Sequence, residues 1–472
     1  GICILTLAHK RLPITEAIQS FLQLSASVFK KQPFWRRAMN LLLHGSIYCN
    51  SAINRPLEQH YGTSTLSNYS PAVSRGAKLF VTAKGTPCRD YIITNFMAPG
   101  SNKAHNDYQH ALPDKENGGI QVWEAARATS AAPVMFTPHS IPGVGTFQDG
   151  GLWQNNPLAV ALSEARDLWP SANIPDVALS IGTGFHKGVE SSTAGDAARL
   201  EDLDPRRTLS DGNELANTSD HVIINFLWKI CFFASILRLL LSLMDSPAMD
   251  SDKCQRYITR HGLTEHQARE RTFRVNVDFP VECPRMDDLN SMQDVRQEAI
   301  KQFSRNSDIQ KIAELLISSL FFLELTERPC RHETYISFQG RILCDVSPGR
   351  QLQRLLSVLL DHRSVFEVCG RLFPLAEMSN DEAITMDFEL HVNGTVTEFT
   401  TPFTVSLIQS QPSGKVSCPI SRSPLDLKGV MTVQGWDCPF IERSVVAKKR
   451  RRGTDFPGVD DLRLRRSKKV RM

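Results

Sequence analysis

The sequence lacks the features that would place it among secreted, metal-binding or cofactor-binding proteins. Its eleven cysteines are odd in number and include no pair spaced as C-x-x-C, which argues against a disulfide framework or a zinc site. No signal peptide is predicted at the start, because no charged segment and no cleavage site flank the first apolar residues. No nucleotide-binding glycine loop and no metal-ligand cluster occur in the sequence, so we expect neither cofactor nor metal.

An excess of positive charge is absent from all but the C-terminal end. The formal net charge is +4, yet residues 443–472 hold twelve Lys and Arg against three Asp and Glu, or +9, which leaves about −5 for the rest. The main part of the chain therefore lacks the basic footprint of a nucleic-acid-binding domain. The run Lys448–Arg452 resembles a nuclear import signal, which importin would bind, or a patch for anionic lipid, and a solvated disordered tail is the plain alternative.

The length and composition of the chain fit one large and one smaller folded unit. The chain has 472 residues, of which 41% are apolar and 22% charged, as in ordinary globular proteins. Helical and strand patterns alternate up to about residue 184, which favours a layered α/β domain. The sequence pattern predicts a helix with Thr15 as N-cap and with Ile18, Phe21, Leu22 and Leu24 on its apolar side, and a second helix from Val122. It also predicts strands at 78–83, 91–96, 177–181 and 274–279, and one or two helices within 287–322.

Two further regions differ from this domain in their pattern of apolar and polar residues. The apolar run Val222–Met244 predicts a buried or membrane-touching helix, because Asn225, Lys229 and Arg238 would be costly at membrane depth. Short alternating stretches such as 386–392 and 396–407, broken by Gly, Pro and Asn-Gly, predict a second, β-rich unit.

Four short motifs follow one another between Val122 and Gly184. They are Ala-Thr-Ser-Ala-Ala-Pro at 128–133, Asp149-Gly150-Gly151, Asn155-Asn156-Pro157 and Ser-Ile-Gly-Thr-Gly at 180–184. Small residues let a helix lie close to neighbouring backbone, and the two glycines place the Asp149 carboxylate on a tight turn. Asn156 and Pro157 are typical of a helix start, as cap and first helical residue. An isolated Asp-Gly-Gly would be an ordinary surface turn.

In this order the four motifs resemble those of patatin-like phospholipases, and Arg274–Val277 and Met286–Asp288 resemble longer members of that family. The resemblance covers residues 1–319. It implies an α/β fold: a three-layer α/β/α patatin-like phospholipase domain over residues 1–325, followed by the β-rich region 331–441 and a basic, disordered tail at 442–472. It also implies a phospholipase or acylglycerol esterase of lipid catabolism, with a glycerophospholipid or other acyl-ester lipid as substrate and contact with a membrane surface.

The resemblance implies a catalytic Ser-Asp dyad in which Asp149, with Gly150 and Gly151 beside it, is the base. A serine hydroxyl becomes a good nucleophile only when a base within hydrogen-bond reach takes its proton. Burial raises the proton affinity of a carboxylate and suits it to this task. In the family the serine lies on a G-x-S-x-G elbow, and Gly1 matches the last glycine of that elbow. The nucleophile is therefore expected just before Gly1, together with the oxyanion loop, so that the chain as given is a fragment without its nucleophile.

Other candidate residues carry weaker signals. Ser64, in Gly62-Thr63-Ser64-Thr65-Leu66, lacks a preceding buried strand and the last glycine of an elbow, which favours an ordinary loop serine. His60, His139 and His186 receive no role, because lone histidines are usually structural or solvated.

Three hypotheses follow. The first is a lipid acyl hydrolase, and the second is a non-catalytic lipid-binding pseudoenzyme or scaffold; the upstream reading frame distinguishes them. The third, a nuclear nucleic-acid binder, depends only on the tail. We expect a cytoplasmic location, with membrane association and nuclear import as open alternatives.

Overall fold

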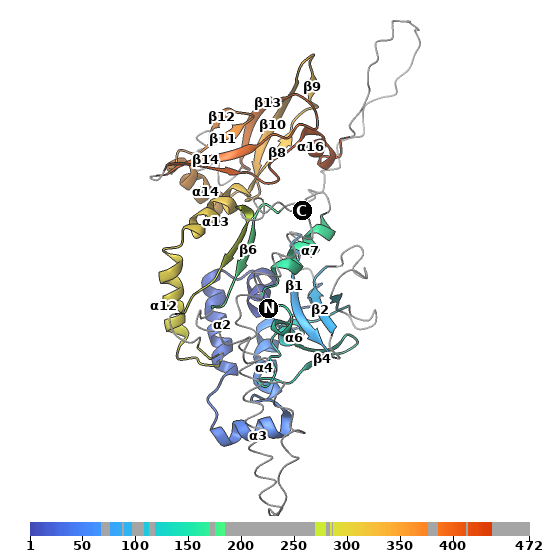
Figure 1. The fold of residues 1–472 in the computed structure, drawn as a ribbon, viewed down its shortest axis with the longest axis vertical. Helices are drawn as coiled ribbons and strands as arrows, with labels where there is room; N and C mark the ends of the chain where they lie inside the picture. The colour runs from blue at the N-terminus through green and yellow to red at the C-terminus, as the bar shows by residue number, and fades with distance from the viewer. Residues whose placement is uncertain are drawn as a thin grey trace, which may run out of the picture. The chain divides into compact units, whose positions relative to one another are not determined.

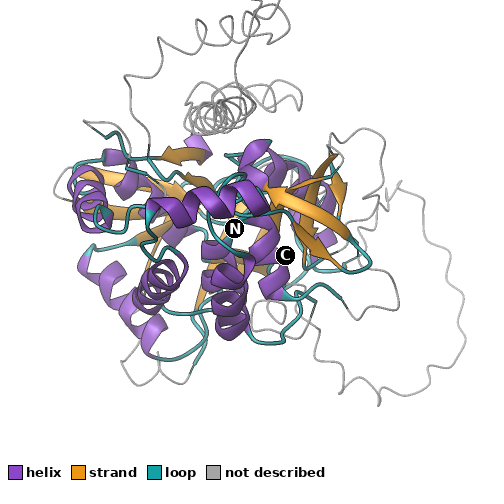
Figure 2. Cartoon of the chain, turned by 90° about the horizontal axis from the view of Figure 1, so that it is seen from below, coloured by secondary structure: helices purple, strands orange, loops and turns teal. Residues whose placement is uncertain are grey.

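A computed structural model of the chain describes residues 1–67, 76–86, 89–96, 108–112, 119–169, 175–184, 270–279, 284–285, 287–375, 386–411 and 414–436. These residues divide into two compact units. The first comprises residues 1–169, 179–184 and 270–305, and the second comprises 175–178 and 306–436. Helices and strands intermix along the described chain (Figure 2), which agrees with an α/β protein. The predictions for Val222–Met244, His186 and the basic tail fall outside the described residues.

The first unit is built around a five-stranded sheet in the order β3-β2-β1-β5-β4. Antiparallel pairing joins β1 to both β2 and β5, whereas β2 and β3 run parallel. The strands are β1 Phe80–Gly85, β2 Arg89–Thr94, β3 Gln109–His110, β4 His139–Ile141 and β5 Gly145–Asp149, and a separate pair is formed by β6 Ala178–Ile181 and β7 Thr272–Val275. The predicted strands at 78–83, 91–96 and 177–181 are therefore confirmed to within a few residues.

Helices of the first unit lie before, between and after these strands (Figure 1). They are α1 Ile2–Ile4, the π-helix η1 Leu5–His9, α2 Ile14–Val28, α3 Phe34–His44, α4 Asn50–Tyr61, α6 Val122–Thr129, the 3-10 turn η2 Gly150–Leu152, α7 Leu158–Leu168 and α12 Met292–Phe303. The core of the unit gathers side chains from η1, α2, α4, α6 and the sheet. Helix α6 contacts β1, β5 and α4, so it stands at the centre of this packing.

Two details of the N-terminal helices differ from expectation. Helix α2 begins at Ile14 with Pro13 as N-cap, and no side chain caps it, so Thr15 is not the cap. Its core-facing residues are Ala17, Leu24, Ser25 and Val28, while Ile18, Phe21 and Leu22 are about 40% exposed. The reason is geometric: positions 17, 24 and 28 form the stripe that meets the core shared with α4.

The second unit has two four-stranded sheets that share one core. One sheet has the order β13-β10-β8 with β9 on β10, and the other has the order β12-β11-β14-β15. The elements are α13 Ser307–Ser318, β8 Phe321–Leu325, β9 Cys330–Arg331, β10 Ile336–Cys344, α14 Arg350–Asp361, β11 Val365–Val368, β12 Arg371–Pro374, β13 Glu389–Val396, β14 Val405–Gln411, β15 Gly414–Pro419 and α16 Leu427–Val433. Phe321 of β8 packs edge-on against Phe366 of β11, with ring centroids 5.2 Å apart.

The β-rich character of this region is confirmed, but one local expectation is wrong. Asn393-Gly394 lies inside β13 and does not break it, because β10 pairs along the whole strand and the Phe338 ring covers Gly394 where a side chain would stand. The region also holds an amphipathic helix, α14, whose Leu352, Leu356 and Leu359 are buried. The predicted domain limits at 325, 331 and 441 remain predictions.

Candidate active site

Asp149 ends strand β5 in the middle of the first unit and begins the turn that the sequence singled out. Its amide donates to the carbonyl of Ala131 at 3.0 Å, which attaches the strand end to the segment after α6. One carboxylate oxygen accepts the Gly151 amide at 2.7 Å, so Asp149 caps the short turn η2. The other oxygen is not engaged by the turn. The local sequence thus fixes one half of the carboxylate and leaves the other half for a partner.

The Asp149 carboxyl has an environment that favours its protonated form. Part of the residue remains accessible, yet burial raises the pKa of the carboxyl above its ordinary value. The Gly151 hydrogen bond acts in the opposite direction. A raised pKa increases the tendency of a carboxylate to take up a proton, which is what a general base must do.

Gly1 precedes the leading helix, which is formed by α1 and η1, and it lies near the Asp149 turn. Its backbone nitrogen lies close enough to the Asp149 carboxylate for the two groups to interact electrostatically. A side chain at Gly1 would overlap Thr129, the last residue of α6. The start of the leading helix, α6 and the Asp149 turn therefore converge in one place within the first unit.

The glycines after Asp149 allow the sheet to approach the turn closely. A Cβ at Gly150 would overlap the backbone carbonyl of Thr82 on β1, so only glycine fits there without a shift of the strand. The Trp153 indole, just after the turn, donates to the carbonyl of Ala83 at 3.1 Å. The turn is therefore held against β1 on both sides of Gly151.

Helix α6 packs against β1 and β5 next to the Asp149 turn through small, buried residues. Ala125, Ala126 and Ala128 are completely buried, in agreement with the expected close approach of backbone. The helix begins with a capping box formed by Gln121 and Glu124, a signal that was missed in the sequence although its residue types are visible there. It carries two buried charged residues, Glu124 of the capping box and Arg127, and Arg127 has no exposed surface.

Arg127 is bound by neutral oxygens and not by an acid. Its guanidinium donates to Asn54 at 3.0 Å, to Asn50 at 3.1 Å and to the carbonyl of Thr137 at 2.8 Å. Burial lowers the pKa of Arg127 to about 10. The pKa of nearby His139 falls to about 4, because burial and the Arg127 charge both disfavour its protonated form. His139 is therefore neutral at pH 7 and stacks obliquely against Trp123.

The two later motifs meet although they are far apart in sequence. Asn156 accepts the Leu158 amide at 3.2 Å and the Ser180 hydroxyl at 2.8 Å, and Arg274 donates to the same hydroxyl at 2.6 Å. Asn276 accepts the Gly184 amide at 2.7 Å. Helix α7 starts at Leu158, so its N-cap is Pro157 and not Asn156 as expected, although the Asn156 side chain accepts the Leu158 amide. The strand predicted at 274–279 ends at Val275, because the Asn276 side chain takes over the backbone amide of Val277.

The weaker candidates take ordinary structural positions. Ser64 follows helix α4 and donates to the carbonyl of Tyr61 at 2.9 Å, so neither a strand nor an elbow precedes it. His60 lies 3.5 Å from the Thr6 hydroxyl and packs edge-on against Tyr61. Within the described part of the chain, no group of three or more His, Cys, Asp and Glu is arranged to hold a metal ion.

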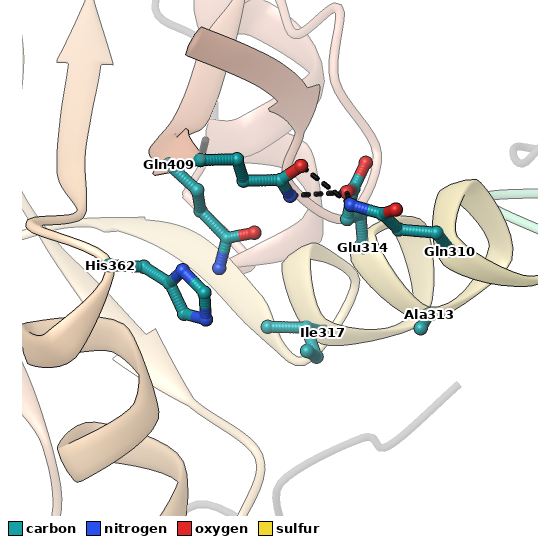
Figure 3. A pocket seen from close by; sticks show the side chains of 7 residues that line it. Gln310, Ala313, Glu314, Ile317, His362 and Gln409 are labelled. Atoms are coloured by element: carbon teal, nitrogen blue, oxygen red, sulfur yellow. Dashed lines mark hydrogen bonds between the residues drawn. The ribbon is translucent and has the colours of Figure 1, made fainter. Parts of the chain in front are cut away.

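An open pocket of about 400 Å³ lies in the second unit, whereas Asp149 belongs to the first. Gln310 and Glu314 of α13 line it together with His362 and Gln409 (Figure 3). Glu314 accepts hydrogen bonds from the side-chain amides of Gln310 and Gln411. Because these polar groups satisfy one another, the pocket does not compete with the Asp149 turn as a place for chemistry.

Comparison with known proteins assigns the first unit. The patatin-like phospholipase family profile matches residues 1–162, which includes the leading helix, α6 and the Asp149 turn. The chain contains a patatin-like phospholipase domain. No solved structure matches the chain significantly.

Three named phospholipases share parts of this patatin-like domain. Calcium-independent phospholipase A2-gamma of Mus musculus is 27% identical over 189 residues, or 39% of this chain and 23% of that protein. Phospholipase A I of Arabidopsis thaliana is 30% identical over 145 residues, or 30% of this chain and 11% of its own length. The cGAMP-activated phospholipase of Vibrio cholerae is 38% identical over 106 residues, or 20% of this chain and 28% of its own length. The chain thus matches about a quarter or less of the first two relatives.

Proposed function

We propose that this protein is a patatin-like lipid acyl hydrolase in which Asp149 is the base of a Ser-Asp dyad. The observation that carries the proposal is the Asp149 carboxylate, buried enough for its pKa to rise, fixed through one oxygen by the Gly151 amide, and next to the start of the leading helix. The family profile and the named phospholipases support the class of reaction.

The proposed reaction follows from these positions. We place the serine a few residues at most upstream of Gly1, near the start of the leading helix, where its hydroxyl would face the carboxylate oxygen that Gly151 leaves open. Asp149 takes the hydroxyl proton as the serine oxygen attacks the ester carbonyl, and it returns that proton to the leaving alcohol. Water, activated by the same carboxylate, then releases the fatty acid. The tight fit of Gly150 on Thr82 keeps the carboxylate in place during both steps.

The substrate proposed is a glycerophospholipid or another acyl-ester lipid, acted on at a membrane surface by a cytoplasmic protein. A three-layer α/β/α arrangement of the complete domain is part of the same proposal. The proposed importin or anionic-lipid contact of Lys448–Arg452 concerns residues outside the described part of the chain. None of the described helices is long and apolar enough to cross a membrane.

The decisive experiment is hydrolysis of a p-nitrophenyl ester by the protein extended upstream of Gly1. Asp149→Asn should lower the rate at least about 100-fold, because the amide cannot accept the proton. The side-chain oxygen of the introduced asparagine can still accept the Gly151 amide, so the fold should persist. Asp90→Asn removes another carboxylate from the same sheet and serves as the control, with an expected rate close to that of the wild type.

The pH profile gives a second readout. Because burial raises the Asp149 pKa, the rate should fall with decreasing pH through a value above the ordinary aspartate range. An unchanged rate in Asp149→Asn would remove this residue from the mechanism. Strong hydrolysis by the protein that starts at Gly1 would show that the nucleophile is placed wrongly.

A further inference from the structure

Helix α3 exposes more large apolar side chains than any other described helix of the first unit. None of its eleven residues is buried. Five of its large apolar side chains are exposed: Phe34 79%, Leu43 66%, Trp35 62%, Leu42 55% and Met39 51%. An ordinary surface helix turns such residues toward the core. Here they face away from it.

The polar side of α3 is the side attached to the protein. Arg37 forms an ion pair with Asp287, whose side chain is only 8% exposed, and the Tyr48 hydroxyl donates to the same carboxylate at 3.1 Å. Asn40 donates to the carbonyl of Ile47 at 3.1 Å. Arg37 and Asn40 are one turn apart and fix the helix by its polar face. The attachment leaves Trp35, Met39 and Leu42, spaced i, i+4 and i+7, on the outer face.

The charged residues close to α3 in the sequence all have one sign. No Asp or Glu occurs between Glu16 and Glu58, whereas Lys30, Lys31 and Arg36 are exposed beside the apolar side chains. Tryptophan, leucine and basic residues on one short amphipathic helix are the composition of elements that lie in the interface of an anionic membrane. A second copy of the chain fits less well, because a self-complementary contact would bring the same basic residues together.

We propose that α3 docks this protein on an anionic lipid surface. Phe34, Trp35, Met39, Leu42 and Leu43 enter the boundary between headgroups and acyl chains, while Lys30, Lys31 and Arg36 lie among the negative headgroups. With eleven residues the helix is far shorter than the roughly 20 residues that cross a bilayer, so it lies in the interface plane. This inference rests on the proposed lipid hydrolysis, which requires access to a lipid surface. Binding to that surface can be measured without hydrolysis.

The test is flotation of the full chain with vesicles of phosphatidylcholine alone or mixed with phosphatidylserine. The wild type should float with the mixed vesicles and much less with phosphatidylcholine alone. Trp35→Gln with Leu42→Gln should weaken partitioning at least about tenfold. Arg36→Gln should weaken it about fivefold, and only on the mixed vesicles. Ile300→Gln on α12 is the matched control, because Ile300 is 58% exposed outside this face, and it should bind as the wild type does.

Three further measurements make the outcome decisive. The thermal unfolding temperature of the double variant should equal that of the wild type, since no α3 side chain is buried. Undiminished vesicle binding by the double variant would overturn the proposal. So would a wild-type dimer that the double variant converts to a monomer without loss of vesicle binding, because α3 would then be a contact between copies. Asp149→Asn should bind vesicles like the wild type, which separates failure of docking from failure of the proposed hydrolysis.

Discussion

Helices α6 and α3 belong to the same unit, and their side chains meet opposite environments. Helix α6 is made largely of small residues and one arginine, yet nearly all of it is buried. Helix α3 carries two aromatic residues, three leucines and a methionine, and none of its residues is buried. Hydropathy alone would predict the reverse. The comparison shows that here burial follows from fit: alanines allow β1 and β5 to come close to α6, whereas large side chains on α3 have nothing in the described chain to cover them.

The largest loss of stability is expected when Arg127 of α6 is replaced. Arg127→Ala removes a completely buried guanidinium and leaves the Asn54 side chain and the Thr137 carbonyl without this donor, whereas Asn50 keeps the Thr137 hydroxyl. We expect a loss of about 3 kcal/mol or more in the free energy of unfolding, measured by urea denaturation. Arg36→Ala on exposed α3 should change it by less than about 0.5 kcal/mol. Equal effects of the two variants would show that the α6 arginine is not part of the core.

The sequence predicted the structure well where the local residue pattern and the tertiary packing favour the same element. Residues 122–128 predicted α6 almost to its ends, since the alanines and the following proline point to the same helix. Asp149 could be selected because its motif stands in an ordered series, and its raised pKa agrees with the expected environment although its role is untested. The approach of Thr82 to Gly150 could not be predicted, because a contact between strands distant in sequence leaves no local pattern.

The remaining differences have the same origin. The apolar face of α2 was assigned by hydrophobicity, but Ile18, Phe21 and Leu22 lie outside the stripe that meets α4. Local hydropathy carries no sign of which face a tertiary partner will cover. Gly394 was taken as a break because glycine weakens isolated strands, whereas the aromatic ring of Phe338 on β10 compensates for its missing side chain. Leu352, Leu356 and Leu359 offered a clear helical spacing that could have identified α14.

A smaller effect is expected where the Asp149 turn meets β1. Gly150→Ala would place a methyl group against the Thr82 carbonyl, so the strand or the turn must shift. The free energy of unfolding should fall by roughly 1–3 kcal/mol, and the ester hydrolysis rate should fall as well. Thermal unfolding and p-nitrophenyl ester turnover measure the two effects. If Thr82→Ala restored both fully, the hydroxyl and not the backbone of Thr82 would limit the fit.

The histidine beside α6 should make stability depend on pH. The folded pKa of His139 is about 4, below the unfolded value of 6.5, so between these values the unfolded chain binds more protons than the folded chain. Its contribution is therefore complete above about pH 6.5 and is lost as the pH falls toward 4. His139→Gln should flatten this part of the pH profile of the unfolding temperature. His9 and His60, whose pKa values burial also lowers, will keep a residual slope. His44→Gln at the exposed end of α3 is the control and should leave the slope unchanged.

The smallest effect on stability is expected for substitutions on α3. It tests directly whether the apolar residues of α3 contribute to the fold. Leu42→Gln replaces a side chain that is 55% exposed, so little apolar surface returns to water on unfolding. The free energy of unfolding in vesicle-free buffer should change by less than about 0.5 kcal/mol. The same substitution in the core, Leu57→Gln on α4, where Leu57 is completely buried, should cost several times more. A comparable loss in both variants would mean that α3 packs against part of its own chain in solution. A loss only at Leu57 leaves the apolar face of α3 with no stabilising role in the isolated protein, so its large side chains must be retained for a partner outside the fold.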